Sequence, residues 1–441
     1  MSGQTALFDM SSLTGYNARD VPFNDTGKRI KTMSNDPLEF KRHLLPSGTR
    51  LYYQHRPLPF TGCRVLIHAG SRRDPPKKQE LMHLLEHLVS SDLRGIPSCT
   101  LTQLERWIAE QRFNCMLGMT ALDYTAYNGN AANARFGNVL RFLHQMTLQP
   151  TFESPLDKER EIVRCEREES ASPKERKMMN ARGLAIFGDD PLARSHSWAE
   201  DAELDQLTID DARAAHGRWY HPANMSLIIV GGINENTALH AAEELFVPDT
   251  RAFVPPDPLP SRAFDLPAKL SYRQKSETKA ELAEVTAWWF LPMCNAHALH
   301  IAADALEERL TESIREKQRA SYGVSVSVES TADHRICNVS VKVQPGYAQR
   351  TGLIILEEAK RLADFDELTR FRDKAELNYE FIEPNISSTF DAATASLIAY
   401  GNTVTIAESL TKLRTVTAED VRTVAREHLT PERAYVEIFE K

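Results

Sequence analysis

Residues 83–87 read His-Leu-Leu-Glu-His, and residues 159–166 read Glu-Arg-Glu-Ile-Val-Arg-Cys-Glu. On an α-helix His83 and His87 stand one turn apart on the same face, so both imidazoles can reach one metal ion. Glu86 lies on that face as well. A catalytic zinc ion takes three protein ligands and keeps a fourth position for water, so a third ligand must come from elsewhere in the chain. The acidic stretch at 159–166 is the predicted source.

The motif could also arise by chance, because the chain contains 14 histidines. In that case His83 and His87 would be two surface residues beside a solvated glutamate. The neighbouring side chains favour the first interpretation, since they are apolar and predict a largely buried helix whose polar atoms need partners. A zinc ion would supply such a partner. The apolar neighbours are Leu81, Met82, Leu84, Leu85, Leu88 and Val89.

The order of residues in the motif is H-x-x-E-H, the inverse of the more common H-E-x-x-H. With this order the chain resembles the pitrilysin or insulinase family of zinc peptidases. It is similar to half-length members such as the mitochondrial processing peptidase β subunit and bacterial relatives, and the resemblance covers nearly the whole chain. Two further segments carry it: residues 65–71, Val-Leu-Ile-His-Ala-Gly-Ser, and residues 219–225, Trp-Tyr-His-Pro-Ala-Asn-Met.

The resemblance implies a set of metal ligands and a catalytic group. One Zn²⁺ per chain would be bound by His83, His87 and Glu166. Glu86 would act as the general base on the water that attacks the peptide bond. Glu159, seven residues before Glu166, would support the site from behind the ligands.

A second constellation lies at residues 315–323, Arg-Glu-Lys-Gln-Arg-Ala-Ser-Tyr-Gly. Arg315 and Tyr322 keep the spacing of an arginine and a tyrosine in the family, which implies that both bind substrate. A guanidinium can donate to a peptide carbonyl or carboxylate, and a phenol can donate to a developing oxyanion. The alternative is an ordinary charged helix end followed by an aromatic residue at the start of a strand.

The chain departs from the family in the strand that grips substrate. Aligned on Thr120, Leu117 stands where the family has asparagine, and Gly118 stands where it has alanine. Asn114 then takes the position of a turn glycine. Either the strand is bulged and Asn114 itself contacts substrate, or one substrate contact is missing, so all three stay candidate substrate-binding residues. In the zinc helix, Glu80 replaces the glycine that the family has three residues before the first histidine.

The organisation of the chain follows from its patterning. Five prolines crowd residues 255–267 and predict a stiff linker, because proline is excluded from helix interiors. The resemblance implies an α+β fold class, with two duplicated halves that each form a mainly antiparallel sheet covered by helices. Only the first half carries the zinc motif. The predicted parts are an N-terminal arm at residues 1–36, a zinc-bearing half at 37–248, the linker at 249–268 and a second half at 269–441.

Composition narrows the possible partners. The chain has 441 residues, of which 42% are hydrophobic and 26% charged, and its net charge is −8. Because no Lys/Arg cluster is interleaved with aromatic residues, we expect no nucleic-acid partner. The six cysteines include no C-x-x-C pair and are predicted to be reduced, which favours the cytoplasm. No run of eighteen apolar residues occurs, so we expect no membrane span.

The motifs and the resemblance together imply a zinc-dependent endopeptidase that hydrolyses peptides or a peptide precursor in a clamshell chamber formed by a dimer. The second subunit would be another copy of the chain or a paralogous, inactive subunit, since Arg315 and Tyr322 lie in the half without zinc. The alternative is a non-catalytic partner subunit of a heterodimeric peptidase or complex. Retention of every residue of the zinc motif favours the enzyme.

Overall fold

The computed structural model divides the chain into two compact units. Among the described residues, those between 38 and 256 and between 385 and 403 form unit 1, while those between 271 and 380 and between 404 and 440 belong to unit 2. The predicted N-terminal arm, except its last residue, and residues 257–268 of the predicted linker lie outside the described part. The structure describes residues 36–91, 101–188, 190–195, 197–256, 271–275, 282–317, 321–344, 346–380 and 385–440.

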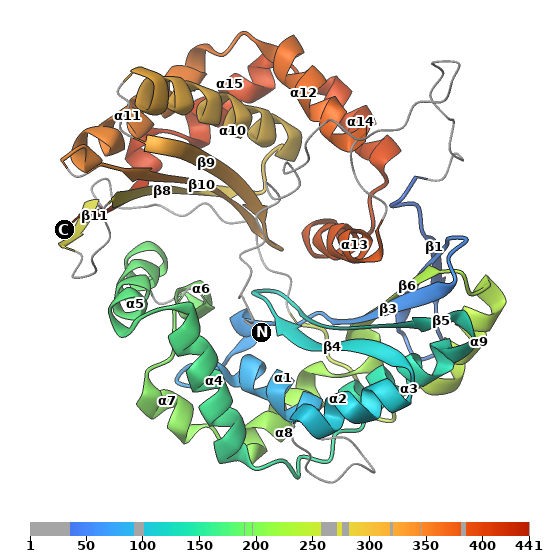
Figure 1. Cartoon of the computed structure of the whole chain (residues 1–441). Coiled ribbons are helices and arrows are strands. Elements are labelled where there is room, and N and C mark those ends of the chain that lie inside the picture. The colour runs from blue at the N-terminus through green and yellow to red at the C-terminus, as the bar shows by residue number, and fades with distance from the viewer. Residues whose placement is uncertain are drawn as a thin grey trace, which may run out of the picture. The chain divides into compact units, whose positions relative to one another are not determined.

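Unit 1 is built on a six-stranded sheet with the order β1-β2-β6-β3-β5-β4 (Figure 1). The pairs are antiparallel except β2 with β6, so the sheet is mainly antiparallel, as expected. Strand β4 lies at one edge and leaves one side of its backbone unpaired within this sheet. The strands are β1 (Lys41–Leu44), β2 (Arg50–His55), β3 (Phe60–Ile67), β4 (Phe113–Thr120), β5 (Thr125–Ala132) and β6 (Met225–Gly231).

The two faces of this sheet are covered by different helices. In β3, Val65 and Ile67 point into the core shared with the helices that follow β3 and β5, whereas Leu66 points to the opposite face. Both faces are buried, which explains the nearly continuous apolar run of β3. The helices of unit 1 that precede residue 256 are α1 (Leu81–Ser91), α2 (Leu101–Glu110), α3 (Phe136–Leu148), α4 (Leu156–Ser170), α5 (Pro173–Phe187), α6 (Pro191–Ser195), α7 (Asp201–Gln206), α8 (Ile209–Trp219) and α9 (Glu235–Leu245).

Helix α13 (Ile386–Tyr400) covers the second face of this sheet, although it comes from the C-terminal part of the chain (Figure 1). Phe390 and Leu397 share one buried apolar cluster with Leu66. The buried guanidinium of Arg64 on β3 donates to Asp391 and to Thr394, both at 2.8 Å. The predicted second half, 269–441, therefore differs from unit 2, because these apolar and polar contacts hold residues 385–403 in unit 1.

Unit 2 repeats the topology of unit 1. Its five-stranded sheet has the order β7-β11-β8-β10-β9, with β7 and β11 parallel and the other pairs antiparallel. Five strands of unit 1, in the order β2-β6-β3-β5-β4, follow the same pattern with one parallel pair at the same place. The expectation of two duplicated α+β halves is confirmed. The strands are β7 (Ser271–Lys275), β8 (Ala283–Pro292), β9 (Ser321–Ser330), β10 (His334–Val343) and β11 (Tyr435–Glu440).

The helices of unit 2 pack on the face of β8 that carries Val285, Ala287 and Trp289. They are α10 (Ala296–Leu310), α11 (Ala348–Arg361), α12 (Leu368–Glu380), α14 (Ile406–Thr415) and α15 (Ala418–His428). A π-helix at Thr311–Lys317 continues α10. Across the described residues, no helix is long and apolar enough to cross a membrane.

The duplication extends to local sequence signals. Helix α8 begins with a capping box in which Thr208 and Asp211 bond reciprocally, and α15 begins with the same device at Thr417 and Asp420. Each helix is followed by a short 3₁₀ turn that opens with proline and leads into the strand that pairs with β3 in unit 1 and with β8 (Ala283–Pro292) in unit 2. Matching caps and turns at matching offsets indicate two copies of one ancestral element.

Candidate metal centre

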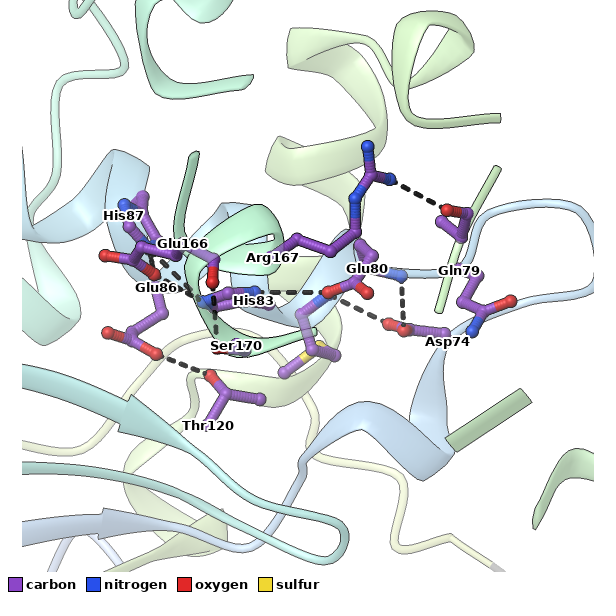
Figure 2. Close-up of polar contacts among 12 residues, drawn as sticks. Asp74, Gln79, Glu80, His83, Glu86, His87, Thr120, Glu166, Arg167 and Ser170 are labelled. Atoms are coloured by element: carbon purple, nitrogen blue, oxygen red, sulfur yellow. Dashed lines mark hydrogen bonds and ion pairs between the residues drawn. The ribbon is translucent and has the colours of Figure 1, made fainter. Parts of the chain in front are cut away.

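Helix α1 presents the predicted motif on its one polar face. The backbone N–H groups of Glu80 and Met82 donate to the carboxylate of Asp74 at 2.9 and 2.8 Å, which satisfies two donors at the start of the helix. The apolar side chains of α1 are buried in the core of unit 1. His83, Glu86 and His87 remain at positions i, i+3 and i+4 on the other face, as Figure 2 shows.

Helix α4 supplies the third side chain. Glu159, Val163 and Glu166 recur at i, i+4 and i+7, so they lie on one face of α4. Val163 is buried in the core that α1 also enters. This packing brings the carboxylate of Glu166 to the histidine pair, although about eighty residues separate them in the chain.

Three donor atoms converge between the two helices. Nε2 of His83 lies 3.2 Å from Nε2 of His87, and Oε2 of Glu166 lies 3.4 and 3.3 Å from the same two nitrogens. Ligands of a tetrahedral zinc ion at about 2.0–2.1 Å stand roughly 3.3 Å apart. The observed triangle therefore fits zinc, and it is the one group of potential metal ligands found within the described ranges.

Charge is concentrated at these donors. Burial by itself would lower the pKa of His83, but hydrogen bonds with Glu166 and Glu80 raise that pKa well above its ordinary value. Burial by itself would raise the pKa of Glu166. Hydrogen bonds with His83 and His87 lower that pKa by a larger amount, so the net shift is downward. A metal cation at this point would replace protons as the positive charge between the carboxylate and the imidazoles.

Each histidine also faces a carboxylate through its other ring nitrogen. Oε2 of Glu80 lies 3.1 Å from Nδ1 of His83. Oε2 of Glu159 lies 3.9 Å from Nδ1 of His87, which is longer than a hydrogen bond, while Ser154 donates to the other oxygen at 3.1 Å. The Glu159 side chain is 0% exposed, so its position behind His87 is fixed by packing.

Glu86 points to the sheet and not to the three donors. The hydroxyl of Thr120, the last residue of β4, donates to Oε2 of Glu86 at 2.9 Å (Figure 2). Gly118 in the same strand leaves the space that the carboxylate occupies: a β-carbon there would lie 2.5 Å from Cγ and 2.7 Å from Cδ of Glu86. The edge strand β4 thus sets the position of this carboxylate beside the candidate metal site.

The predicted substrate-binding residues of β4 lie at different points of the strand. A bulge interrupts the pairing with β5 between Met116 and Met119, so Leu117 and Gly118 together stand opposite Tyr127. Asn114 is exposed and pairs with Asn130, and it precedes Thr120 by six residues, or about 20 Å along a strand. The structure therefore brings Gly118, and not Asn114, to the metal centre; the Leu117 side chain lies outside the described part.

Arg315 and Tyr322 belong to unit 2. Arg315 is exposed on the π-helix that follows α10, and Tyr322 is the second residue of β9. Seven-residue π-helices are rare and often occur at functional sites. The side chain of Tyr322 lies outside the described part, so the roles of both residues stay predictions.

Two contacts of this site were missed by sequence reasoning. The sequence does not indicate the bond between Thr120 and Glu86, because it joins residues 34 positions apart. In the sequence Glu80 is only a departure from the family, and its position three residues before His83 keeps the two side chains within reach of each other.

Fold and site together define a class: a two-unit α+β metallopeptidase fold with an inverted zinc motif. Residues 50–198 match the family described as "Insulinase (Peptidase family M16)", and residues 206–374 match "Peptidase M16 inactive domain". The chain therefore belongs to the pitrilysin/insulinase family, as a half-length member, which confirms the resemblance. An uncharacterized zinc protease of Streptomyces coelicolor is 21% identical over 408 residues, covering 88% of this chain and 87% of that protein.

Solved structures share the fold at low sequence identity. A protease from Helicobacter pylori matches with a TM-score of 0.75 and 16% identity, covering 91% of this chain and 99% of that one. The periplasmic protease PqqL of Escherichia coli matches with a TM-score of 0.72 and 19% identity, over 96% of this chain and 49% of that one. A peptidase M16 inactive domain from Pseudomonas fluorescens gives 0.73 and 14%, over 91% and 98%.

Proposed function

We propose that this chain is a zinc-dependent endopeptidase that hydrolyses peptides or a peptide precursor. The observation that carries the proposal is the convergence of His83, His87 and Glu166 at 3.2–3.4 Å with the Glu86 carboxylate beside them. Family members that have lost activity typically lack one or more of these residues. Their retention here argues against the second candidate, a non-catalytic partner subunit.

In this mechanism His83, His87 and Glu166 would hold one Zn²⁺ per chain. A bound zinc ion lowers the pKa of a water molecule toward neutrality and polarises a carbonyl group. Glu86 takes the proton from the attacking water and delivers it to the leaving amine. The hydroxyl of Thr120 donates to Oε2 of Glu86 at 2.9 Å and so orients the base.

Substrate binding and assembly are part of the same proposal. The unpaired edge of β4 offers backbone groups to which an extended peptide adds as a further strand. Arg315 and Tyr322 complete the site from a second subunit of a clamshell dimer, either a copy of this chain or a paralogous partner. We propose the cytoplasm as the compartment, because the described cysteines are free.

The test is the variant Glu86→Gln. It should retain one zinc per chain and the wild-type melting temperature, yet lose nearly all hydrolysis of a mixed peptide library followed by mass spectrometry. Hydrolysis at the wild-type rate by this variant would refute the role of Glu86. If the wild-type chain binds zinc and cleaves nothing in any mixture with paralogues, the non-catalytic alternative is favoured.

A further inference from the structure

Glu80 has an unusual backbone conformation. It directly precedes α1, and its φ angle is +69°, in the left-handed region that glycine adopts without cost. A residue with a β-carbon is destabilised there by roughly 1–2 kcal/mol. Such strain persists where the surroundings fix it, and it often marks a functional position.

The side chain of Glu80 bends toward the metal centre. Its Oε2 atom lies 3.1 Å from Nδ1 of His83, and the side chain is only 11% exposed (Figure 2). Its backbone N–H donates to Asp74, so the main chain of Glu80 is held as well. Both the main chain and the carboxylate of Glu80 are therefore held in place, the first by Asp74 and the second by His83.

The contact between Glu80 and His83 determines which ring nitrogen of a neutral His83 carries the hydrogen. Nε2 of His83 faces the other two donors, so its lone pair must be free to bind a cation. The ring hydrogen then has to be on Nδ1, where the Glu80 carboxylate accepts it. A carboxylate behind a metal-bound histidine fixes the tautomer and the ring orientation and increases the basicity of the ligand.

We propose that Glu80 is a positioning residue of the metal centre, which orients His83 for metal binding. This role rests on the metal site assigned under the proposed function. It makes Glu80 the counterpart of Glu159: one carboxylate stands behind each histidine, at 3.1 Å for His83 and at 3.9 Å for His87. The shorter contact is that of Glu80, whose backbone is in the strained left-handed conformation.

The experiment compares Glu80→Gly with Lys77→Gly. Glycine at position 80 relieves the backbone and removes the carboxylate, so the metal-free melting temperature should stay level or rise while zinc affinity falls ten- to a hundredfold. Lys77 is the matched control because it is exposed and has a φ of +62° in the same segment. Lys77→Gly should relieve similar strain and keep wild-type zinc affinity.

Zinc affinity is measured at one pH by competition with a chromophoric chelator. Glu80→Gln should recover part of the loss, because its amide oxygen can still accept the hydrogen on Nδ1. If Glu80→Gly binds zinc as tightly as the wild type, Glu80 has no positioning role and the metal site stands without it. If the wild-type chain binds no zinc, the metal site is refuted and this role with it.

Discussion

Gly118 and Glu86 are packed so closely that no β-carbon fits between the edge strand and the Glu86 carboxylate. A β-carbon on Gly118 would lie 2.5 Å from Cγ and 2.7 Å from Cδ of Glu86, well inside any real contact distance. Thr120, two residues further along β4, donates to the same carboxylate. The edge strand therefore leaves Glu86 one position.

Gly118→Ala should displace the Glu86 carboxylate without touching the metal donors. We expect kcat/KM to fall by about a hundredfold, because a shift of about 1 Å in a catalytic group costs that much. Zinc content should stay at the wild-type level. Gly137→Ala in α3 is the matched control, since nothing lies within 4 Å of a β-carbon there and activity should not change. Equal activity of the two variants would show that a β-carbon at position 118 does not displace the Glu86 carboxylate.

Glu166 and Glu159 should differ in their importance for metal retention. Oε2 of Glu166 is within 3.3–3.4 Å of both donor nitrogens, whereas Glu159 reaches only Nδ1 of His87 at 3.9 Å. Metal analysis after dialysis should find Glu166→Ala largely empty and Glu159→Ala weakened about ten- to a hundredfold. The reverse order would mean that Glu159 is the metal ligand.

Activity should depend on a second subunit if Tyr322 acts across a dimer. Glu86→Gln and Tyr322→Phe chains, each inactive alone, would form mixed dimers with one intact site out of two. Equal mixing with subunit exchange should then restore up to about a quarter of wild-type activity. The mixture is assayed for peptide hydrolysis after native mass spectrometry has detected the mixed dimer. Mixed dimers without activity would exclude completion of the site in trans within a homodimer.

Acid should destabilise unit 1 partly through His216. Its Nε2–H donates to the carbonyl of Thr147 at 2.9 Å, and burial lowers its pKa from 6.5 to about 4. Between these two pH values the unfolded chain binds a proton that the folded chain does not. The free energy of unfolding is therefore highest above about pH 6.5 and decreases as the pH is lowered toward about 4. The contribution approaches about 1.4 kcal/mol per pH unit.

His216→Gln keeps a donor for the Thr147 carbonyl and removes the titrating group. Urea unfolding of the metal-free chain at pH 7, 6 and 5 should show a shallower dependence of the unfolding free energy on pH. His240→Gln serves as the control because His240 is exposed on α9, and its variant should keep the wild-type slope. An unchanged slope for His216→Gln would show that His216 is not the titrating group.

Much of the metal centre could be predicted because its information is local. His83, Glu86 and His87 occupy one helix face by spacing alone, and a run of apolar neighbours predicts the buried side. Glu166 could be located only through the family resemblance, since nothing in one sequence says which acidic helix packs on α1. The structure supplies that contact through the shared core around Val163.

The features that were missed are those formed between distant residues or by backbone conformation. The positive φ of Glu80 follows from the turn before α1, which no residue pattern encodes for a glutamate. Helix α13, formed by residues 386–400, lies within the predicted second half, 269–441. Its partner Arg64 lies more than three hundred residues earlier, and the pattern of α13 does not reveal which sheet it covers.

Helix α13 makes the order of synthesis relevant to folding. As the nascent chain leaves the ribosome, the first sheet is complete once β6 has emerged, but one face has no cover until residues 385–403 follow. At 5–20 residues per second this delay is on the order of ten seconds. Throughout that time Phe40, Tyr52, Leu66 and Ile228 present an apolar surface that chaperones can bind. Translation must therefore pass through most of the second unit before the first can close.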